Sequence, residues 1–134
     1  EVIKAAQLLA AQGVASTVFS VTSWSELARD GAAASVRAEP HPVRPELVEG
    51  LRQAQPERMV PFIARQLAAS QGPIVAATDY VRAVPESIRA YLPEGRRYTT
   101  LGTDGFGRSD TRAALRGFFG VDAASIVKAA LQAL

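Results

Sequence analysis

The residues with the clearest chemical potential lie in one glycine-rich stretch, residues 104–110. It reads Asp104, Gly105, Phe106, Gly107, Arg108, Ser109 and Asp110. Such a loop can bind an anion through backbone N–H groups at a helix start, with an arginine adding charge. The spacing is not Gly-x-Gly-x-x-Gly, and no Gly-Lys-Ser/Thr follows, so neither nucleotide-binding fingerprint is met. The commoner alternative is a tight turn in which Phe106 packs on a neighbouring surface and Arg108 pairs with a carboxylate.

Other candidates for catalysis are few. The only histidine, His41, stands between two prolines and has no metal-ligating residues at a suitable spacing. A hydrogen-bonded loop histidine is the simpler interpretation, although the titration range of histidine leaves catalysis open. Asp79, Asp104 and Asp110 stand where turns and helix caps favour aspartate. We therefore predict no catalytic residue, no cofactor ligand and no metal ligand in this chain.

The composition is that of a globular core. The chain has 134 residues, 48% of them hydrophobic and 21% charged, with a net charge of +2 and no cysteine. One domain is expected at this length. The small net charge argues against a nucleic-acid or polybasic membrane surface, and no apolar run approaches the roughly 20 residues that span a bilayer. The absence of cysteine fits a reducing compartment, so we expect a cytoplasmic protein. Because the sequence opens in a helical pattern without Met, we expect a fragment of a longer chain.

Helical and strand patterns alternate along the sequence. Gly13 and Gly31 are expected to end the first two helices, Pro61 to begin the third, and Asp79 to cap the fourth, which contains Pro85. Ser109 or Asp110 should cap the fifth helix and Asp122 the last, where Val121 and Ile126 form a hydrophobic staple. The expected helices are 1–12, 24–29, 62–68, 80–92, 110–119 and 123–134, and the expected strands are 15–21, 74–78 and 98–101.

This alternation predicts an α/β fold, a three-layer sandwich around a mainly parallel sheet. Three strands are few for this class, so we expect that a first strand is missing upstream of residue 1. The glycine-rich loop follows the last strand, and such loops build sites and domain contacts at the carboxyl ends of strands. Residues 32–57 hold several prolines and lack a clear period, which indicates a surface excursion.

Three stretches, residues 20–31, 77–80 and 101–110, resemble the C-terminal domain of the homodimeric, thiamine-diphosphate-dependent pyruvate dehydrogenases of the transketolase superfamily. The string Leu-Gly-Thr-Asp-Gly-Phe-Gly-Arg-Ser-Asp carries most of the resemblance, which covers the chain outside about residues 32–57. In that family the parent enzyme decarboxylates pyruvate and transfers the acetyl group to lipoyl groups. The resemblance implies a five-stranded, mainly parallel sheet, of which the first strand is missing here.

The resemblance also implies partners and cofactors for the parent protein. Thiamine diphosphate and Mg²⁺ would lie between the two preceding domains, so this domain itself would bind neither and would be inactive alone. The expected partners are the other domains, a second subunit and the dihydrolipoamide acetyltransferase, with loop 104–110 as an interface. The alternatives are a stand-alone phosphate- or nucleotide-binding module, or the same domain of another enzyme of the superfamily. The sequence departs from the family between His41 and Arg58, where we expect an inserted segment near Pro45–Pro56.

Overall fold

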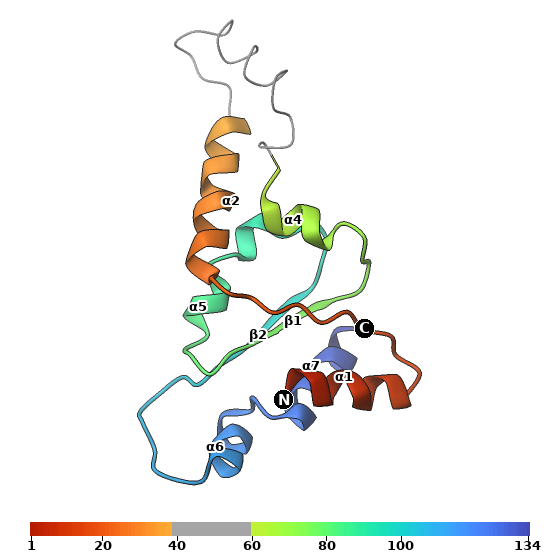
Figure 1. The fold of residues 1–134 in the computed structure, drawn as a ribbon, viewed down its shortest axis with the longest axis vertical. Coiled ribbons are helices and arrows are strands. Elements are labelled where there is room, and N and C mark those ends of the chain that lie inside the picture. The colour runs from red at the N-terminus through yellow and green to blue at the C-terminus, as the bar shows by residue number, and fades with distance from the viewer. Residues whose placement is uncertain (39–59) are drawn as a thin grey trace, which may run out of the picture. The chain divides into compact units, whose positions relative to one another are not determined.

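The structure is a computed structural model that describes residues 1–38 and 60–134. The chain divides into two compact units. The first unit comprises Glu1–Thr22, Gly72–Glu86 and Arg96–Leu134, and the second comprises Ser23–Gln71 and Ser87–Gly95. Figure 1 shows the elements of each unit. His41 and the proposed insertion lie outside the described residues, and the expectation of a single domain stays a prediction.

A two-stranded parallel sheet lies at the centre of the first unit. Strands β1 (Ile74–Ala77) and β2 (Tyr98–Leu101) are paired from Ile74↔Tyr98 to Ala77↔Leu101. Both segments are short, apolar or β-branched, which suits a strand covered on two sides. Both strands and their parallel pairing were predicted, and the α/β class is confirmed.

Helices cover both faces of this sheet. On one face, Val75, Ala77 and Leu101 pack against a core formed by α1 (Val2–Ala11) and α7 (Ala123–Ala133). On the other face, the Tyr98 hydroxyl donates to the Pro85 carbonyl at 2.8 Å, so the short helix α5 (Ala83–Glu86) lies against β2. The layers are therefore helix, sheet and helix, on a small scale.

Helices α1 and α7 pack against each other through residues at helical spacing. Ala5 and Leu9 of α1 are buried against Ile126 and Val127 of α7. The α7 start follows the prediction, because the Asp122 carboxylate accepts from the Ser125 N–H at 2.9 Å. Val121 and Ile126 are both buried, as a hydrophobic staple requires. Helix α6 (Arg112–Phe119) precedes α7 and ends at Gly120, which has a left-handed φ of 68°.

The second unit contains α2 (Trp24–Ala38), α4 (Phe62–Leu67) and the 3₁₀ helix η2 (Arg89–Tyr91). The prediction that Gly31 ends α2 is wrong, because Gly31 lies inside this helix. A Cβ at Gly31 would meet the Tyr91 ring, at 2.7 Å from Cδ1 and closer still to two other ring atoms. The glycine therefore allows η2 to approach α2. The second unit also has a link between helices: the Phe62 N–H donates to the Asp30 carboxylate at 2.6 Å.

Three further predictions are wrong. Residues 15–21 form no strand in this structure, and Val18 and Phe19 are about half exposed. Helix 80–92 is replaced by α5, which contains Pro85, and by η2, because a turn at residues 87 and 88 separates them. Residues 32–38 of the expected excursion belong to α2, and residues 39–57 lie outside the described part of the chain.

Candidate functional site

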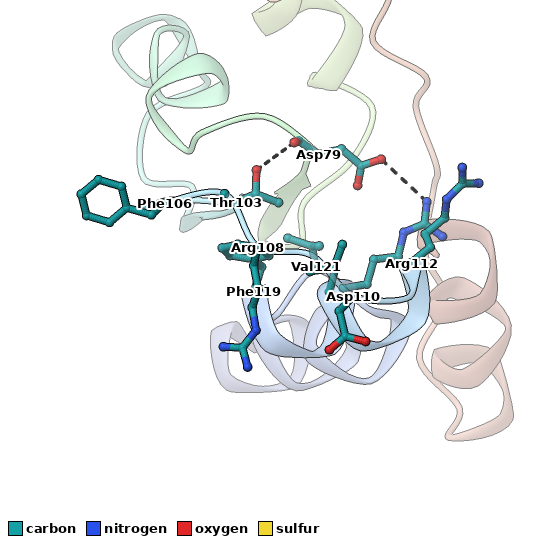
Figure 2. A pocket seen from close by; sticks show the side chains of 12 residues that line it. Asp79, Thr103, Phe106, Arg108, Asp110, Arg112, Phe119 and Val121 are labelled. Atoms are coloured by element: carbon teal, nitrogen blue, oxygen red, sulfur yellow. Dashed lines mark hydrogen bonds and ion pairs between the residues drawn. The ribbon is translucent and has the colours of Figure 1, made fainter.

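The glycine-rich loop begins where β2 ends, at the same sheet edge as the loop that follows β1. The pairing of Ala77 with Leu101 brings the two loops together. They border a cavity of about 510 Å³. Residues of α6 and Val121, which lies between α6 and α7, complete its wall, as Figure 2 shows. The predicted position of the loop, at the carboxyl ends of parallel strands, is confirmed. The lining residues that carry the argument are Asp79, Phe106, Arg108, Asp110, Arg112 and Arg116.

The base of the loop is fixed to the neighbouring turn by close backbone contact. A Cβ on Gly102 would lie 2.6 Å from the Tyr80 carbonyl oxygen and 2.8 Å from the Arg82 nitrogen. The next residue, Thr103, donates its N–H to the Tyr80 carbonyl at 2.9 Å and its hydroxyl to the Asp79 carbonyl at 2.8 Å. Glycine at position 102 is therefore required by space, and the exit from β2 has one defined path.

Asp104 completes this attachment. One carboxylate oxygen accepts from the Arg82 N–H at 2.8 Å, and the other pairs with the Arg82 guanidinium. These hydrogen bonds from the Arg82 side chain and backbone hold the pKa of Asp104 below its ordinary value. Asp104 thus has the structural role that its place in a turn predicted.

The tip of the loop makes a different set of contacts. Gly105 has a φ of 105°, which favours glycine, and Phe106 follows with 98% of its surface exposed. Arg108 lies over the ring of Phe118 in α6, with 4.4 Å between the guanidinium carbon and the ring centroid. Within the described residues Arg108 pairs with no carboxylate, and Phe106 packs on no neighbouring surface. The described residues supply neither contact, so the expected packing of Phe106 and the expected pairing of Arg108 stay predictions.

Helix α6 begins one or two residues later than predicted. Its N-cap is Thr111, whose hydroxyl accepts from the Ala114 N–H at 3.3 Å. Asp110 instead accepts from the Thr111 N–H at 2.7 Å, and Ser109 is not the cap. The cap is fixed by the extended backbone at Thr111, with ψ of 151°. The sequence analysis named Ser109 or Asp110, and it missed the next residue, Thr111, which also carries a side-chain oxygen.

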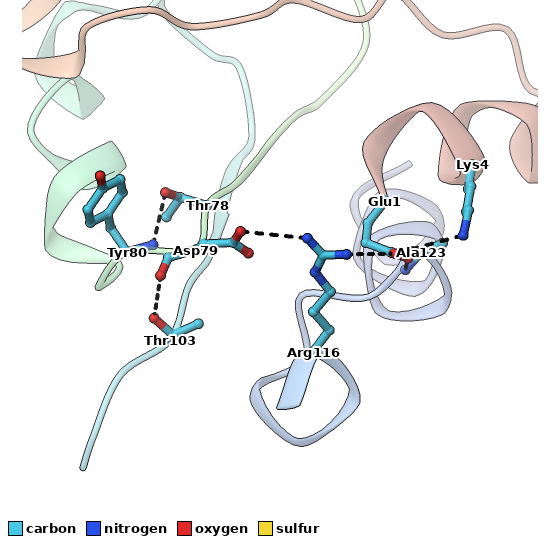
Figure 3. A network of polar contacts seen from close by, with 8 residues as sticks. All are labelled: Glu1, Lys4, Thr78, Asp79, Tyr80, Thr103, Arg116 and Ala123. Atoms are coloured by element: carbon cyan, nitrogen blue, oxygen red, sulfur yellow. Dashed lines mark hydrogen bonds and ion pairs between the residues drawn. The ribbon is translucent and has the colours of Figure 1, made fainter. Parts of the chain in front are cut away.

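A polar network behind the cavity joins α6 to three other elements (Figure 3). Arg116 lies 3.3 Å from the Glu1 carboxylate and 3.7 Å from that of Asp79. Glu1 also accepts from the Ala123 N–H at 3.0 Å, and this hydrogen bond is the main reason that the pKa of Glu1 is lowered. The prediction that Asp79 caps a helix is therefore wrong. Its carboxylate faces Arg116, and α5 begins only at Ala83.

This arrangement suits recognition better than catalysis. The cavity side chains that carry charge are three arginines and two aspartates. Arg116 is already balanced by Glu1 and Asp79, while Asp110 and Arg112 carry opposite charges two residues apart. Among the described residues, no group of three or more His, Cys, Asp or Glu side chains could hold a metal ion. No helix in the part of the chain that the structure describes could cross a bilayer.

The structure brings the predicted loop residues 104–110 together with side chains that the sequence did not single out. Two of these side chains contact the loop, namely Arg82 and Phe118. Two others line the cavity, namely Arg112 and Arg116. Arg112 and Arg116 are one helical turn apart, which was a readable signal, since residues i and i+4 share a helix face. Nothing in the sequence indicates that Arg82 pairs with Asp104, 22 residues further on.

A small parallel sheet with helices on both faces, and a glycine-rich loop at the strand ends, define an α/β domain. The family model described as the transketolase-like TK C-terminal domain matches residues 1–122. This match covers most of the chain and both of its units. The chain belongs to this family, as the resemblance implied.

Curated relatives carry one name. The chain is 48% identical, over 133 residues, to the pyruvate dehydrogenase E1 component of Mycobacterium tuberculosis, covering 98% of the chain and 13% of the relative. It is 45% identical over 135 residues to that of Cupriavidus necator, covering 100% of the chain and 14% of the relative. It is 43% identical over 129 residues to that of Escherichia coli K12, covering 96% of the chain and 13% of the relative. The chain thus spans about one seventh of the length of these relatives.

Proposed function

We propose that this chain is the C-terminal domain of a pyruvate dehydrogenase E1 component, and that it contributes contacts and not catalytic groups. The parent enzyme would decarboxylate pyruvate with thiamine diphosphate and Mg²⁺ and transfer the acetyl group to lipoyl groups. It would act as a cytoplasmic homodimer together with a dihydrolipoamide acetyltransferase. The proposal is supported by relatives that are 43–48% identical over nearly the whole chain.

The carboxylates of the cavity do not fit the Mg²⁺ ion of the cofactor. Mg²⁺ needs oxygen ligands in an octahedral arrangement. The two carboxylates available are those of Asp79, which faces Arg116, and Asp110, which accepts from the Thr111 N–H. We therefore assign no step of the reaction to this chain and propose that the cofactor lies in the other domains of the parent.

The observation that carries a contact role is the exposure of Phe106. A phenylalanine that is 98% exposed loses the benefit of burial, which is worth about 1.5–3 kcal/mol for a large apolar side chain. It stands on a loop whose base is fixed by Gly102, Thr103 and Asp104. An exposed aromatic next to an arginine, on a loop with a fixed base, has the composition of an interface hot spot. We propose that loop 104–110 contacts other domains or the second subunit of the parent.

Photo-crosslinking in the parent enzyme tests this role. Phe106 is replaced by p-benzoylphenylalanine, the full-length protein is irradiated, and crosslinked peptides are identified by mass spectrometry. We expect crosslinks from position 106 to residues outside this 134-residue segment. The matched control places the same group at Val36, which is exposed on α2 and far along the chain from the loop. If position 106 yields no crosslink outside the segment, the contact role is wrong.

A functional measurement accompanies the crosslinking. Phe106→Ala should weaken assembly of the parent by about 2 kcal/mol, the lower bound for a hot-spot residue, which is about 30-fold in affinity. Arg108→Ala should weaken it as well. Sedimentation of the full-length variants, together with their turnover of pyruvate, reports this loss. Unchanged assembly and turnover in both variants would contradict the proposal.

A further inference from the structure

Arg108 lies near the loop tip, and among the residues that the structure describes it forms no ion pair with a carboxylate. Arg82 is paired with Asp104, and Arg116 faces both Glu1 and Asp79. Arg112 shares its end of the helix with Asp110, and Figure 2 shows Arg108 and Arg112 on different sides of the hollow. The charged side chains that line the cavity are three arginines and two aspartates, so their formal charges sum to one positive charge. A single carboxylate would balance it.

The guanidinium of Arg108 is also held in position. It stacks on the Phe118 ring at 4.4 Å, and Phe118 itself packs edge-on against Phe119. The contact with the ring uses none of the five N–H donors, which lie in the plane of the guanidinium. A planar guanidinium with free edges suits a carboxylate, which it can bind through two parallel hydrogen bonds. Holding the group in advance reduces the entropy lost on binding.

We propose that Arg108 receives an aspartate or glutamate side chain from another part of the parent enzyme, beside the recess that accepts Phe106. This inference rests on the proposed function, because it names the chemistry of the partner at the same loop. Phe118 acts as a positioning residue that orients Arg108. The partner surface should therefore combine an apolar recess with one acidic side chain at its edge.

A protein carboxylate fits the surroundings better than a free phosphate. Phosphate carries up to two negative charges at neutral pH, and the cavity wall presents the carboxylates of Asp79 and Asp110. Arg116 already faces two carboxylates, so among the described cavity residues only Arg108 and Arg112 are left to oppose them. The exposed ring of Phe106 next to it has no use in binding a small inorganic anion but suits a protein surface. The absence of both nucleotide fingerprints agrees with this choice.

Carbodiimide coupling in the full-length enzyme tests the pairing, because it joins a lysine amine directly to a carboxylate that it touches, with loss of water. Arginine does not react, so Arg108→Lys introduces a new coupling point. We expect an isopeptide bond from position 108 to an Asp or Glu outside this segment, absent from the wild type. Arg29→Lys is the positive control, since Arg29 pairs with Glu26 in α2 and should couple within the chain.

The outcomes separate this inference from the proposed function. Crosslinks from position 106 without coupling from position 108 would leave the interface in place and overturn the carboxylate partner. Coupling from position 108 only to Asp110 or Asp79 would also overturn it. If inorganic phosphate protects Arg108 from phenylglyoxal while no coupling occurs, the site binds a small anion instead. Phe118→Leu in the Arg108→Lys background should lower coupling at 108 and leave coupling at 29 unchanged; equal coupling at 108 would refute the positioning role.

Discussion

Two glycines between β2 and α6 should change the stability of the first unit in opposite directions when each is replaced by alanine. Gly102 and Gly107 are five residues apart, and both lack a left-handed φ. A Cβ on Gly102 would lie 2.6 Å from the Tyr80 carbonyl oxygen, which is backbone and cannot rotate away. A Cβ on Gly107 would meet no atom within 4 Å. Gly102→Ala should therefore destabilise the first unit, and Gly107→Ala should not.

The expected difference can be estimated from the structure. Forcing a methyl group into filled space costs about 1–3 kcal/mol. The backbone shift also threatens the hydrogen bond from the Thr103 N–H to the Tyr80 carbonyl, worth about 1 kcal/mol. Alanine returns about 0.4–1 kcal/mol, because it restricts the unfolded chain. The net loss for Gly102→Ala is about 2 kcal/mol, whereas Gly107→Ala should gain up to about 1 kcal/mol.

Urea unfolding measures this difference. With an m value of about 1–3 kcal/mol per molar urea, a loss of about 2 kcal/mol lowers the midpoint by roughly 1 M. Because the chain has two units, the first unit should be followed by its own signal, such as the Thr100 amide in β2. If Gly102→Ala and Gly107→Ala have the same midpoint, the close approach of the loop to Tyr80 and Arg82 is wrong.

Two other predictions concern α2 and the acid range. Gly31→Ala should destabilise the second unit by about 1 kcal/mol, since overpacking against Tyr91 outweighs the helix propensity gained. Trp24 fluorescence in urea measures this, and an unchanged midpoint would contradict the close approach of Tyr91 to Gly31. The pKa values of Glu1, Asp104 and Asp122 are lowered in the folded chain, so the unfolded chain binds more protons in acid. Their stabilisation should be complete above the ordinary pKa values, near 4, and be lost as pH falls through the lowered ones. The urea midpoint measured against pH should show this decline, with a smaller slope in Asp104→Asn; an identical slope would contradict the role of Arg82.

The elements that could be predicted are those that local pattern decides. β1 and β2 follow from short apolar or β-branched runs between turn residues, and α1 and α7 follow from helical spacing. The Asp122 cap was readable because its acceptor and the Ser125 N–H are three residues apart. Each of these signals is complete within about ten residues.

The errors occurred where a distant residue decides the outcome. Gly31 was taken for a helix end, but Tyr91, 60 residues later, requires the glycine inside the helix. Asp79 was taken for a cap, but Arg116 faces its carboxylate. The segment 15–21 has the composition of a strand, yet a strand exists only through a partner's hydrogen bonds, which composition cannot supply.

The same division between near and distant determinants explains the candidate site. The sequence located loop 104–110 because three glycines and a helix start lie close together, and the family string runs through them. The base of the loop is fixed by Arg82 and Tyr80, and Arg108 at its tip contacts Phe118. These contacts join residues that are distant in the sequence, so only the structure shows them.

The chemistry of the loop tip limits what it can give the proposed enzyme. Residues 105–109 are Gly, Phe, Gly, Arg and Ser, so no group between the two flanking aspartates titrates near neutral pH. Asp104 has a lowered pKa and is engaged with Arg82, which makes it a poor proton donor or base at neutral pH. The tip presents an exposed aromatic ring and an arginine, so it suits the contact role proposed for loop 104–110 better than proton transfer.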